Sequence, residues 1–459
     1  MAAVPAPTPS RRGLIIGLLL SVVAIAFEAT AVVTAMPAAV DDLGNLDLYA
    51  WAFTGFVIAQ TLSIVAAGQA ADRFGPVRPL IAGFAIFAVG LALAGAATTM
   101  GMLVVARTIQ GLGGGTMNLA VMVLVGRAFD GRERASLMTA FSAAWMVPAF
   151  AGPPLAAWLA ETWSWHWVFW SVLPVLLLAG LLVIRPLLGL SLPAHTEAVQ
   201  PPRRHLRMAL LVAAGAASLQ WAGQRIEPAS LLWLTVGLGL LIWGLPPLMP
   251  AGFSLTGRGL SAVVNVRALT SGAFFGAQTF LPLMFTTAWG LSLQWAAATM
   301  IVGSVGWMTG AWLQSRSWMR FRRDTIIVIG AALTAVGLLA VASAALMPWP
   351  GPGPGVGLVM VGWTCCGVGM GLSNASTSLA VMQLSPAVAL GRNTSSLQVG
   401  EALGNSLSAG IAGTLYVIAG GGTSVDGFGA LMVAMLVISG LAVLSSARIG
   451  HVENHSVAL

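Results

Sequence analysis

The chain has 459 residues, of which 58% are hydrophobic and only 8% are charged. Soluble domains carry about a quarter charged residues, so this composition excludes a water-soluble globular protein and predicts that most of the chain contacts lipid. The formal net charge is +7. No soluble basic stripe is available to bind a polyanion, so we expect no nucleic-acid partner.

A membrane-spanning helix needs about 20 predominantly apolar residues, and the chain offers fourteen such segments. The segment 208–224 is short and carries Gln220, so it is the weakest of them. If it is not a span, then 229–248 is not one either, because the orientation of the later spans requires an even number. Twelve spans are therefore the alternative. The predicted spans are 13–40, 48–71, 77–98, 101–126, 135–159, 165–187, 208–224, 229–248, 268–289, 293–314, 325–347, 355–384, 393–418 and 426–447.

The arginines indicate how these spans are oriented. If the N-terminus is cytoplasmic, every arginine except Arg107 and Arg225 falls in a cytoplasmic segment, including Arg267 and Arg323. Positive residues favour the cytoplasmic side, so we expect a multi-pass protein of the bacterial inner (plasma) membrane with both termini in the cytoplasm. The predicted outer loops hold acids instead, namely Asp41, Asp42, Asp47, Glu161, Glu227 and Asp426.

Two longer polar stretches, around 185–207 and 249–267, divide the chain. The expected organisation is a cytoplasmic tail, a first six-helix bundle, a cytoplasmic loop with two linker helices, a second six-helix bundle and a second tail. The expected boundaries are 1–12, 13–187, 188–257, 258–447 and 448–459.

The first span reads FEATAVVTAMP from Phe27 to Pro37, and Glu28 is its one charged residue. The segment resembles the l-D-x-T-v-v-n-v-A-l-P motif of fourteen-helix drug/proton antiporters of the major facilitator superfamily. Thr30, Ala35 and Pro37 match the motif, and Glu28 replaces its aspartate. Glutamate keeps the chemistry of the carboxyl group and changes its reach by one methylene.

The segment between the second and third spans reads GQAADRFGPVR. It resembles the superfamily signature G-x-L-A-D-R-x-G-R-R, although Pro76 and Val77 depart from it. In the family this loop latches the two halves on the cytoplasmic side; the alternative is a solvated turn. The matching residues are Gly68, Asp72, Arg73, Gly75 and Arg78. The second half carries a faded copy, in which Gly310 is followed by Gln314 at the acidic position and by Arg320 at the offset of Arg78.

The fourth span reads LVVARTIQGLGGG and resembles the family motif l-x-x-x-R-x-x-q-G-x-g. At 3.6 residues per turn, one helix face holds Arg107, Gln110, Gly111, Gly114 and Asn118. A charge in lipid costs at least about 2.5 kcal/mol, so this face is expected to point at a cavity or a partner. The alternative is an arginine that extends to the membrane interface near the end of the span.

The fifth span contains Gly152 and Pro153 and partly resembles the exporter motif g-x-x-x-G-x-x-x-G-P-x-x-G-G. Small residues permit close packing and the proline permits a bend; ordinary helix packing is the alternative. Trp145 lies in the middle of the same span, where it could stack on a substrate or pack against lipid or the core.

A second acid, Glu401, lies in the thirteenth span. Gln398, Glu401, Asn405 and Ser408 form a polar stripe at helical spacing, which is typical of a helix that lines a water-filled path. A structural role in hydrogen bonding is the alternative for Glu401. Ser395 with Gln398 fits a capping box at the start of this helix.

Taken together, the motifs imply an all-α integral membrane protein with the major facilitator fold: two six-helix bundles plus two linker helices. The resemblance implies a proton-coupled exporter of drugs or other amphipathic small molecules by alternating access. Proton coupling is expected at Glu28, Arg107 and Glu401. The substrate cavity is expected at Gln110, Asn118, Trp145, Gln398 and Asn405.

The partners are a small molecule, protons and the lipid bilayer, and we expect a monomer. We expect neither enzymatic activity nor a cofactor nor a metal, and the proton gradient supplies the energy. No lysine exists for a phosphate-binding loop. Three alternatives stay open: an exporter of an endogenous metabolite or lipid, a proton-coupled importer, and a membrane-embedded sensor or scaffold.

Overall fold

The computed structural model of the chain describes residues 11–129, 131–188, 204–224, 227–314, 316, 319–347, 352–386, 389–419 and 425–453. These residues form helices and contain no strand. The outermost parts of the predicted tails, 1–10 and 454–459, lie outside the described residues, as does most of the predicted loop after the sixth span.

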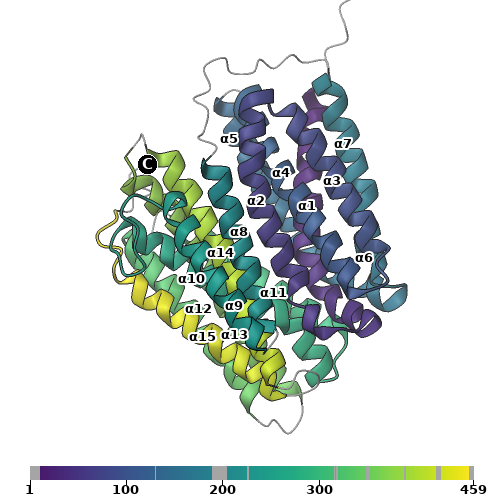
Figure 1. The fold of residues 1–459 in the computed structure, drawn as a ribbon, viewed down its shortest axis with the longest axis vertical. Coiled ribbons are helices and arrows are strands. Elements are labelled where there is room, and N and C mark those ends of the chain that lie inside the picture. The colour runs from purple at the N-terminus through teal and green to yellow at the C-terminus, as the bar shows by residue number, and fades with distance from the viewer. Residues whose placement is uncertain are drawn as a thin grey trace, which may run out of the picture.

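The first half of the chain forms six membrane-crossing rods (Figure 1). The last rod consists of two helices that meet at Ser171. The helices are α1 (Arg11–Leu43), α2 (Trp51–Phe74), α3 (Val77–Gly95), α4 (Met100–Ala128), α5 (Gly131–Thr162), α6 (His166–Trp170) and α7 (Val172–Leu188), with the short helix η1 (Leu46–Leu48) before α2.

The second half repeats this arrangement. Helix α1 packs on α5 and α7, α2 packs on α4, and α3 packs on α4; in the same way α10 packs on α14 and α15, α11 on α13, and α12 on α13. The helices are α10 (Leu260–Leu283), the π-helical η3 (Met284–Ala288), α11 (Leu293–Gln314), α12 (Arg323–Leu346), α13 (Pro352–Leu384), α14 (Leu390–Ile418) and α15 (Val425–Ser446).

Two linker helices, α8 (Arg204–Gln224) and α9 (Pro228–Gly244), join the halves, and the short helix η2 (Pro246–Leu248) follows them. Helix α8 packs against α2, α14 and α9, so it bridges the two bundles (Figure 1). Helix α9 exposes large apolar side chains such as Leu231, Ile242 and Trp243, which suits a helix that faces lipid.

Each predicted span overlaps a helix, and the fourteen-helix prediction is confirmed. Thirteen helices of the described residues are long and apolar enough to cross a membrane. The remaining predicted span is α14, whose 29 residues suffice in length but whose polar stripe lowers its hydropathy.

Three local predictions are wrong. Helix α10 begins at Leu260 rather than at 268, so Arg267 lies two turns inside a helix and not in a loop. Arg323 is the first residue of α12 and is buried. Helix α14 begins at Leu390, so Ser395 lies inside it and cannot form the predicted capping box.

The described part of the second predicted tail, residues 448–453, packs against the neighbouring helices. The backbone N–H of Arg323 donates to the carbonyl of Val452 (2.9 Å), and Ile449 and Val452 are buried in an apolar cluster with Ile327 and Leu397. This segment therefore packs on the second bundle.

The two ends of the bundle differ in charge. One end, here called the acidic end, carries Asp41, Asp42, Asp47, Glu161 and Glu227; the opposite, arginine-rich end carries Arg12, Arg73, Arg78, Arg185, Arg392 and Arg448.

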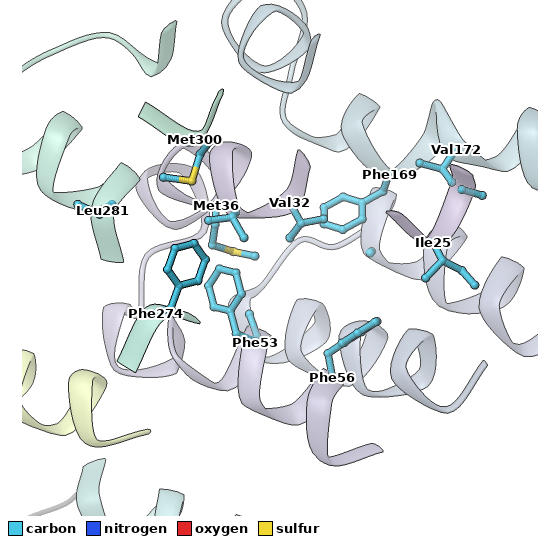
Figure 2. Packing of buried hydrophobic residues seen from close by; sticks show 14 of the residues in the cluster. Ile25, Val32, Met36, Phe53, Phe56, Phe169, Val172, Phe274, Leu281 and Met300 are labelled. Atoms are coloured by element: carbon cyan, nitrogen blue, oxygen red, sulfur yellow. The ribbon is translucent and has the colours of Figure 1, made fainter. Parts of the chain in front are cut away.

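The two halves meet toward the acidic end. The Tyr49 hydroxyl donates to the carbonyl of Thr279 (2.8 Å), and the Gln294 amide donates to the Glu161 carboxylate (3.2 Å). Deeper in the molecule, the apolar core runs across the interface, with Phe274 beside Phe53 (Figure 2). Contacts between the halves therefore close the acidic end.

Candidate functional site

A cavity of about 760 Å³ lies between the two halves. Helices α1, α2, α4 and α5 line it from one side, and α10, α14 and η2 line it from the other. It reaches from Arg107 and Thr279 in the interior to Gly68 and Arg392 at the arginine-rich end. The cavity therefore approaches one face of the molecule and is closed toward the other.

Glu28 and Arg107 form a buried ion pair beside this cavity. Glu28 is 1% exposed and lies on α1, and Arg107 is 3% exposed and lies on α4. Neither carboxylate oxygen of Glu28 has a hydrogen-bond partner among the described residues, apart from this ion pair. A carboxylate this deeply buried depends on its cation, because an unpaired buried charge is costly.

Arg107 has other partners besides Glu28. Its Nε donates to the carbonyl of Ala52 (3.0 Å), and its Nη1 donates to Oε1 of Gln110 (2.6 Å). Its guanidinium also stacks 4.4 Å from the centroid of the Phe56 ring. Arg107 lines the cavity and does not extend to the membrane interface, which excludes the alternative of a snorkelling side chain.

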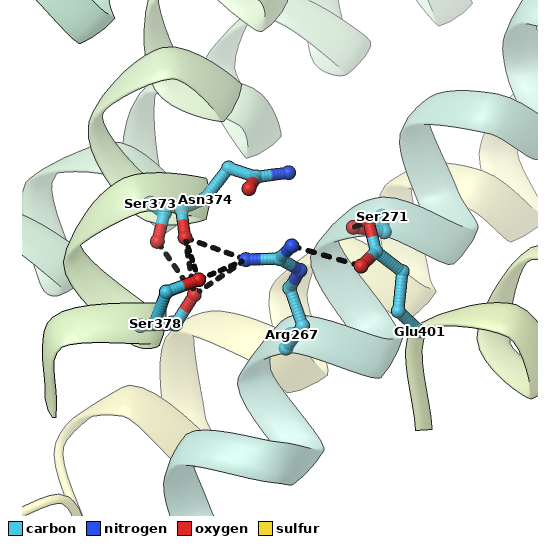
Figure 3. A network of polar contacts seen from close by, with 7 residues as sticks. Arg267, Ser271, Ser373, Asn374, Ser378 and Glu401 are labelled. Carbon is cyan, nitrogen blue, oxygen red and sulfur yellow. Dashed lines mark hydrogen bonds and ion pairs between the residues drawn. The ribbon is translucent and has the colours of Figure 1, made fainter. Parts of the chain in front are cut away.

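The second acid, Glu401, pairs with Arg267. Nη2 of Arg267 lies 2.8 Å from Oε2 of Glu401, and the Ser271 hydroxyl donates to Oε1 (3.3 Å). The other end of the guanidinium donates to Thr377 (2.9 Å) and to the carbonyl of Asn374 on α13 (Figure 3). Glu401 lines the cavity and its side chain is 21% exposed, so water has better access to it than to Glu28.

Each half thus holds one glutamate–arginine pair, and the two pairs do not lie on corresponding pairs of helices, because α14 corresponds to α5 rather than to α4. The first half places the acid on α1 and the base on α4, whereas the second places the base on α10 and the acid on α14. Two ion pairs therefore lie at one cavity. The net charge of either pair would rise by one if its carboxylate took up a proton.

Four of the five predicted cavity residues line the cavity, and Gln110 does not. Asn118, Trp145, Gln398 and Asn405 line the cavity, and the Trp145 side chain is exposed. Gln110 does not line it, because it packs against Gly90 of α3 and holds Arg107 instead. Ser408, the last residue of the predicted stripe, faces Gly272 of α10 and is buried.

The motif loop after α2 lies at the arginine-rich end. Gly75 has φ = 79°, a conformation that favours glycine, and it ends α2. Arg73 and Arg78 both stack on Phe74, at 5.1 Å and 5.7 Å from the ring centroid. Gly68 lines the cavity, while the side chain of Asp72 lies outside the described residues.

The first and fifth spans meet at Gly152. A Cβ atom added to Gly152 would lie 2.7 Å from the Thr30 hydroxyl, which itself donates to the carbonyl of Pro148 (3.1 Å). Pro153 is buried next to this contact. Glycine therefore permits the close approach of α1 and α5, which positions the helix that carries Glu28.

In the second-half copy of the loop motif, Gln314 is paired with Arg323 and not with the predicted Arg320. Gln314 accepts a hydrogen bond from Nη1 of Arg323 (2.6 Å), and both residues are buried. Arg320, which occupies the offset of Arg78, is exposed.

Three cavity features escaped the sequence analysis: Arg267 behind Glu401, Arg392 at the mouth, and Gln278 of α10. Arg267 lies four residues before Ser271, a spacing that places both on one face of a helix and could have indicated the site. Because the arginine interrupts an apolar run, however, it resembles a loop residue. Arg392 stood just before the predicted start of its span, and nothing in the sequence marked Gln278.

The chain is similar to known transporters. A family model described as "Major Facilitator Superfamily" matches residues 18–321. The "Multidrug transporter protein MdtP" of Bacillus subtilis is 35% identical over 181 residues, which cover 39% of this chain and 34% of that protein. An "Uncharacterized MFS-type transporter" of Mycobacterium tuberculosis is 28% identical over 435 residues, covering 90% of this chain and 61% of that protein. The matches therefore span only about a third to three fifths of these relatives.

Solved structures share the fold. The "peptide transporter POT in complex with sulfate" has a TM-score of 0.69 and 15% sequence identity, with 96% of this chain and 95% of that chain covered. At this identity the likeness shows the fold alone.

Proposed function

Because the chain belongs to the Major Facilitator Superfamily, a family of transporters rather than enzymes, we propose that it exports amphipathic small molecules in exchange for protons. The observation that carries the proposal is the buried Glu28–Arg107 pair beside a cavity that is closed toward one face. The Bacillus subtilis relative is named as a multidrug transporter, which supports the substrate class. The energy source is the proton gradient, with no cofactor, in a monomer.

The way the halves touch supports alternating access. The cavity reaches the arginine-rich end, while the Tyr49–Thr279 hydrogen bond and the apolar contacts of Ala157 with Leu293 and Ala297 close the acidic end. Arginine-rich ends favour the cytoplasm. This orientation makes the present conformation inward-open, with both termini on the cytoplasmic side of a bacterial inner membrane.

Glu28 is the main proton carrier in this scheme. Pairing with Arg107 favours the ionised carboxylate, so the inward-open conformation corresponds to the state after proton release. In the outward-open conformation, separation of the pair leaves a carboxyl group in a low-dielectric site, which favours the protonated form. Arg107 remains held by Ala52, Gln110 and the Phe56 ring, which limits the cost of separation.

The cycle then couples two movements. Substrate enters from the cytoplasm, the halves rock, and substrate leaves while Glu28 takes a proton from the outside. The return step delivers the proton when Arg107 pairs again with Glu28. One positive charge that moves inward gains about 2.3 kcal/mol per 100 mV of membrane potential, and this energy drives export.

Glu401 is a second protonation site. It faces the cavity and is held by Arg267 and Ser271. Its greater exposure gives it contact with the water of the cavity in the inward-open state, which supports a second role in proton coupling.

The proposal is tested with a panel of apolar and amphipathic probes in proteoliposomes under an imposed pH gradient. Uptake into inside-out vesicles with an acidic lumen is expected for the wild type, and dissipation of the gradient should stop it. Accumulation in the opposite direction would identify an importer. Binding of probes without counterflow would identify a sensor and contradict transport.

A further inference from the structure

The charged groups of the cavity carry an inference about the substrate that rests on the proposed export function. Three ionisable side chains line the cavity: Arg107, Glu401 and Arg392. The first two are neutralised by Glu28 and Arg267 directly behind them. Among the described residues, Arg392 has no carboxylate within ion-pair distance.

Arg392 lies at the mouth of the cavity and is exposed. Its Nη2 donates to the carbonyl of Met249 (2.7 Å), just after η2. This hydrogen bond fixes one edge of the guanidinium, and an arginine has five N–H donors in all. The remaining N–H donors stay available to an anion. A guanidinium can bind the protein and an anion at the same time in this way, because its donors point in fixed, different directions.

The surroundings of Arg392 provide a polar wall. Ser395, Gln398 and Asn405 continue along the same face of α14 toward the interior. Oδ1 of Asn405 and Oε1 of Gln278 are buried, line this cavity and have no hydrogen-bond partner in the described structure. Both oxygens are hydrogen-bond acceptors, so each is costly unless an N–H or O–H donor of a ligand or of water completes it.

The opposite wall offers apolar side chains among polar ones. Phe53, Val57, Ile64 and Val65 of α2 line the cavity together with Thr54, Gln60, Thr61 and Gln69 of the same helix, and Trp145 of α5 is exposed beside them. A molecule that fills the space must therefore offer an apolar face to α2 and acceptors to Arg392.

We propose that the cavity takes an amphipathic anion, whose charged group binds Arg392 at the mouth and whose apolar body lies against α2. The anionic group stays near the aqueous mouth while the apolar body is desolvated. The site does not compete with Glu28 for Arg107, so the bound anion leaves the Glu28–Arg107 ion pair in place. Anionic drugs and anionic single-chain lipids share this chemistry.

A matched pair of fluorescent probes tests the charge. 8-Anilinonaphthalene-1-sulfonate and N-phenyl-1-naphthylamine share one ring system and differ by the sulfonate. For the wild type we expect saturable transport of the sulfonate. For Arg392→Gln, KM for the sulfonate should rise about tenfold to a hundredfold, the usual range for a lost charge-assisted hydrogen bond, while transport of the neutral probe stays the same. Arg392→Lys should recover part of the affinity.

Two control variants separate charge from structure. Ser396 also ties α14 to this segment, because its hydroxyl donates to the carbonyl of Leu248 (2.7 Å); Ser396→Ala loosens the segment without removing charge. Arg185→Gln removes an exposed arginine of α7 that does not line the cavity. Neither should change KM for the sulfonate. Equal losses in Ser396→Ala and Arg392→Gln would overturn the proposal.

The remaining outcomes are also decisive. Competition of the sulfonate by lysophosphatidylglycerol would identify an anionic lipid as the source of the group, whereas competition by soluble sulfonates alone would identify a free small molecule. Transport of the neutral probe but not of the sulfonate would overturn the anion site and leave export intact. If the wild type moves neither probe nor any member of the wider panel, the proposed function itself fails.

Discussion

Inside-out vesicles that hold the Glu28→Gln variant are expected to equilibrate substrate without accumulating it when the lumen is more acidic than the medium. With the membrane potential clamped at zero and a gradient of about two pH units, the wild type should accumulate substrate about 100-fold for one proton per molecule, since one unit is about 1.4 kcal/mol. Glutamine keeps the shape of the Glu28 side chain but carries no exchangeable charge. Substrate accumulation at equilibrium is the measurement.

A damaged fold must be distinguished from lost coupling. Glu28→Gln leaves the 3% exposed Arg107 without its carboxylate, and an uncompensated buried charge costs about 3–5 kcal/mol. The double variant Glu28→Gln/Arg107→Gln removes both charges and should recover much of the thermal stability. If the account is right, it regains stability without regaining gradient-driven accumulation. Accumulation by either variant at the wild-type level would remove Glu28 from the mechanism.

A disulfide across the acidic end is expected to stop transport completely and reversibly. A Cβ atom built on Gly413 of α14 would lie 2.7 Å from Cβ of Ala50, next to the start of α2. Disulfides need Cβ atoms about 3.5–4.5 Å apart, so the cysteines of Ala50→Cys/Gly413→Cys can bond after the helices separate by about 1 Å. The bond would hold the two halves together where the outward-open state requires them to part.

The background for this experiment is Cys365→Ala/Cys366→Ala, which removes the native thiols of α13. Transport should vanish on oxidation and return on reduction, while each single cysteine variant stays active under both conditions. Binding of a probe from the cytoplasmic side should survive oxidation, because the cavity reaches the arginine-rich end. Undiminished transport by the oxidised double variant would contradict alternating access at this interface.

The sequence predicted the helices well because the membrane imposes one length and one composition on them. Glu28 and Arg107 were visible as single charges inside apolar runs. Their pairing was not, since the two residues lie on helices far apart in the chain and only packing brings them together. The approach of α1 to α5 at Gly152 likewise depends on which faces meet.

The errors had the same physical origin. A span is recognised by an apolar run, and Arg267 interrupts the run that begins α10. A buried arginine with carboxylate, hydroxyl and carbonyl partners behaves differently from the loop arginine that the hydropathy pattern suggests. Helix α14 illustrates the opposite case. Its polar stripe lowers its mean hydropathy below that of the other spans, yet the helix supplies much of the cavity wall.

In the proposed cycle, substrate binding in the inward-open state and proton binding at Glu28 exclude each other. This claim can be tested by adding substrate to the protein in weakly buffered detergent solution, at a pH where the carboxyl group is partly protonated, while a pH indicator is recorded. The wild type should release up to one proton per bound substrate, and Glu28→Gln should bind substrate and release none. Proton uptake by the wild type, or equal release by both proteins, would contradict the claim.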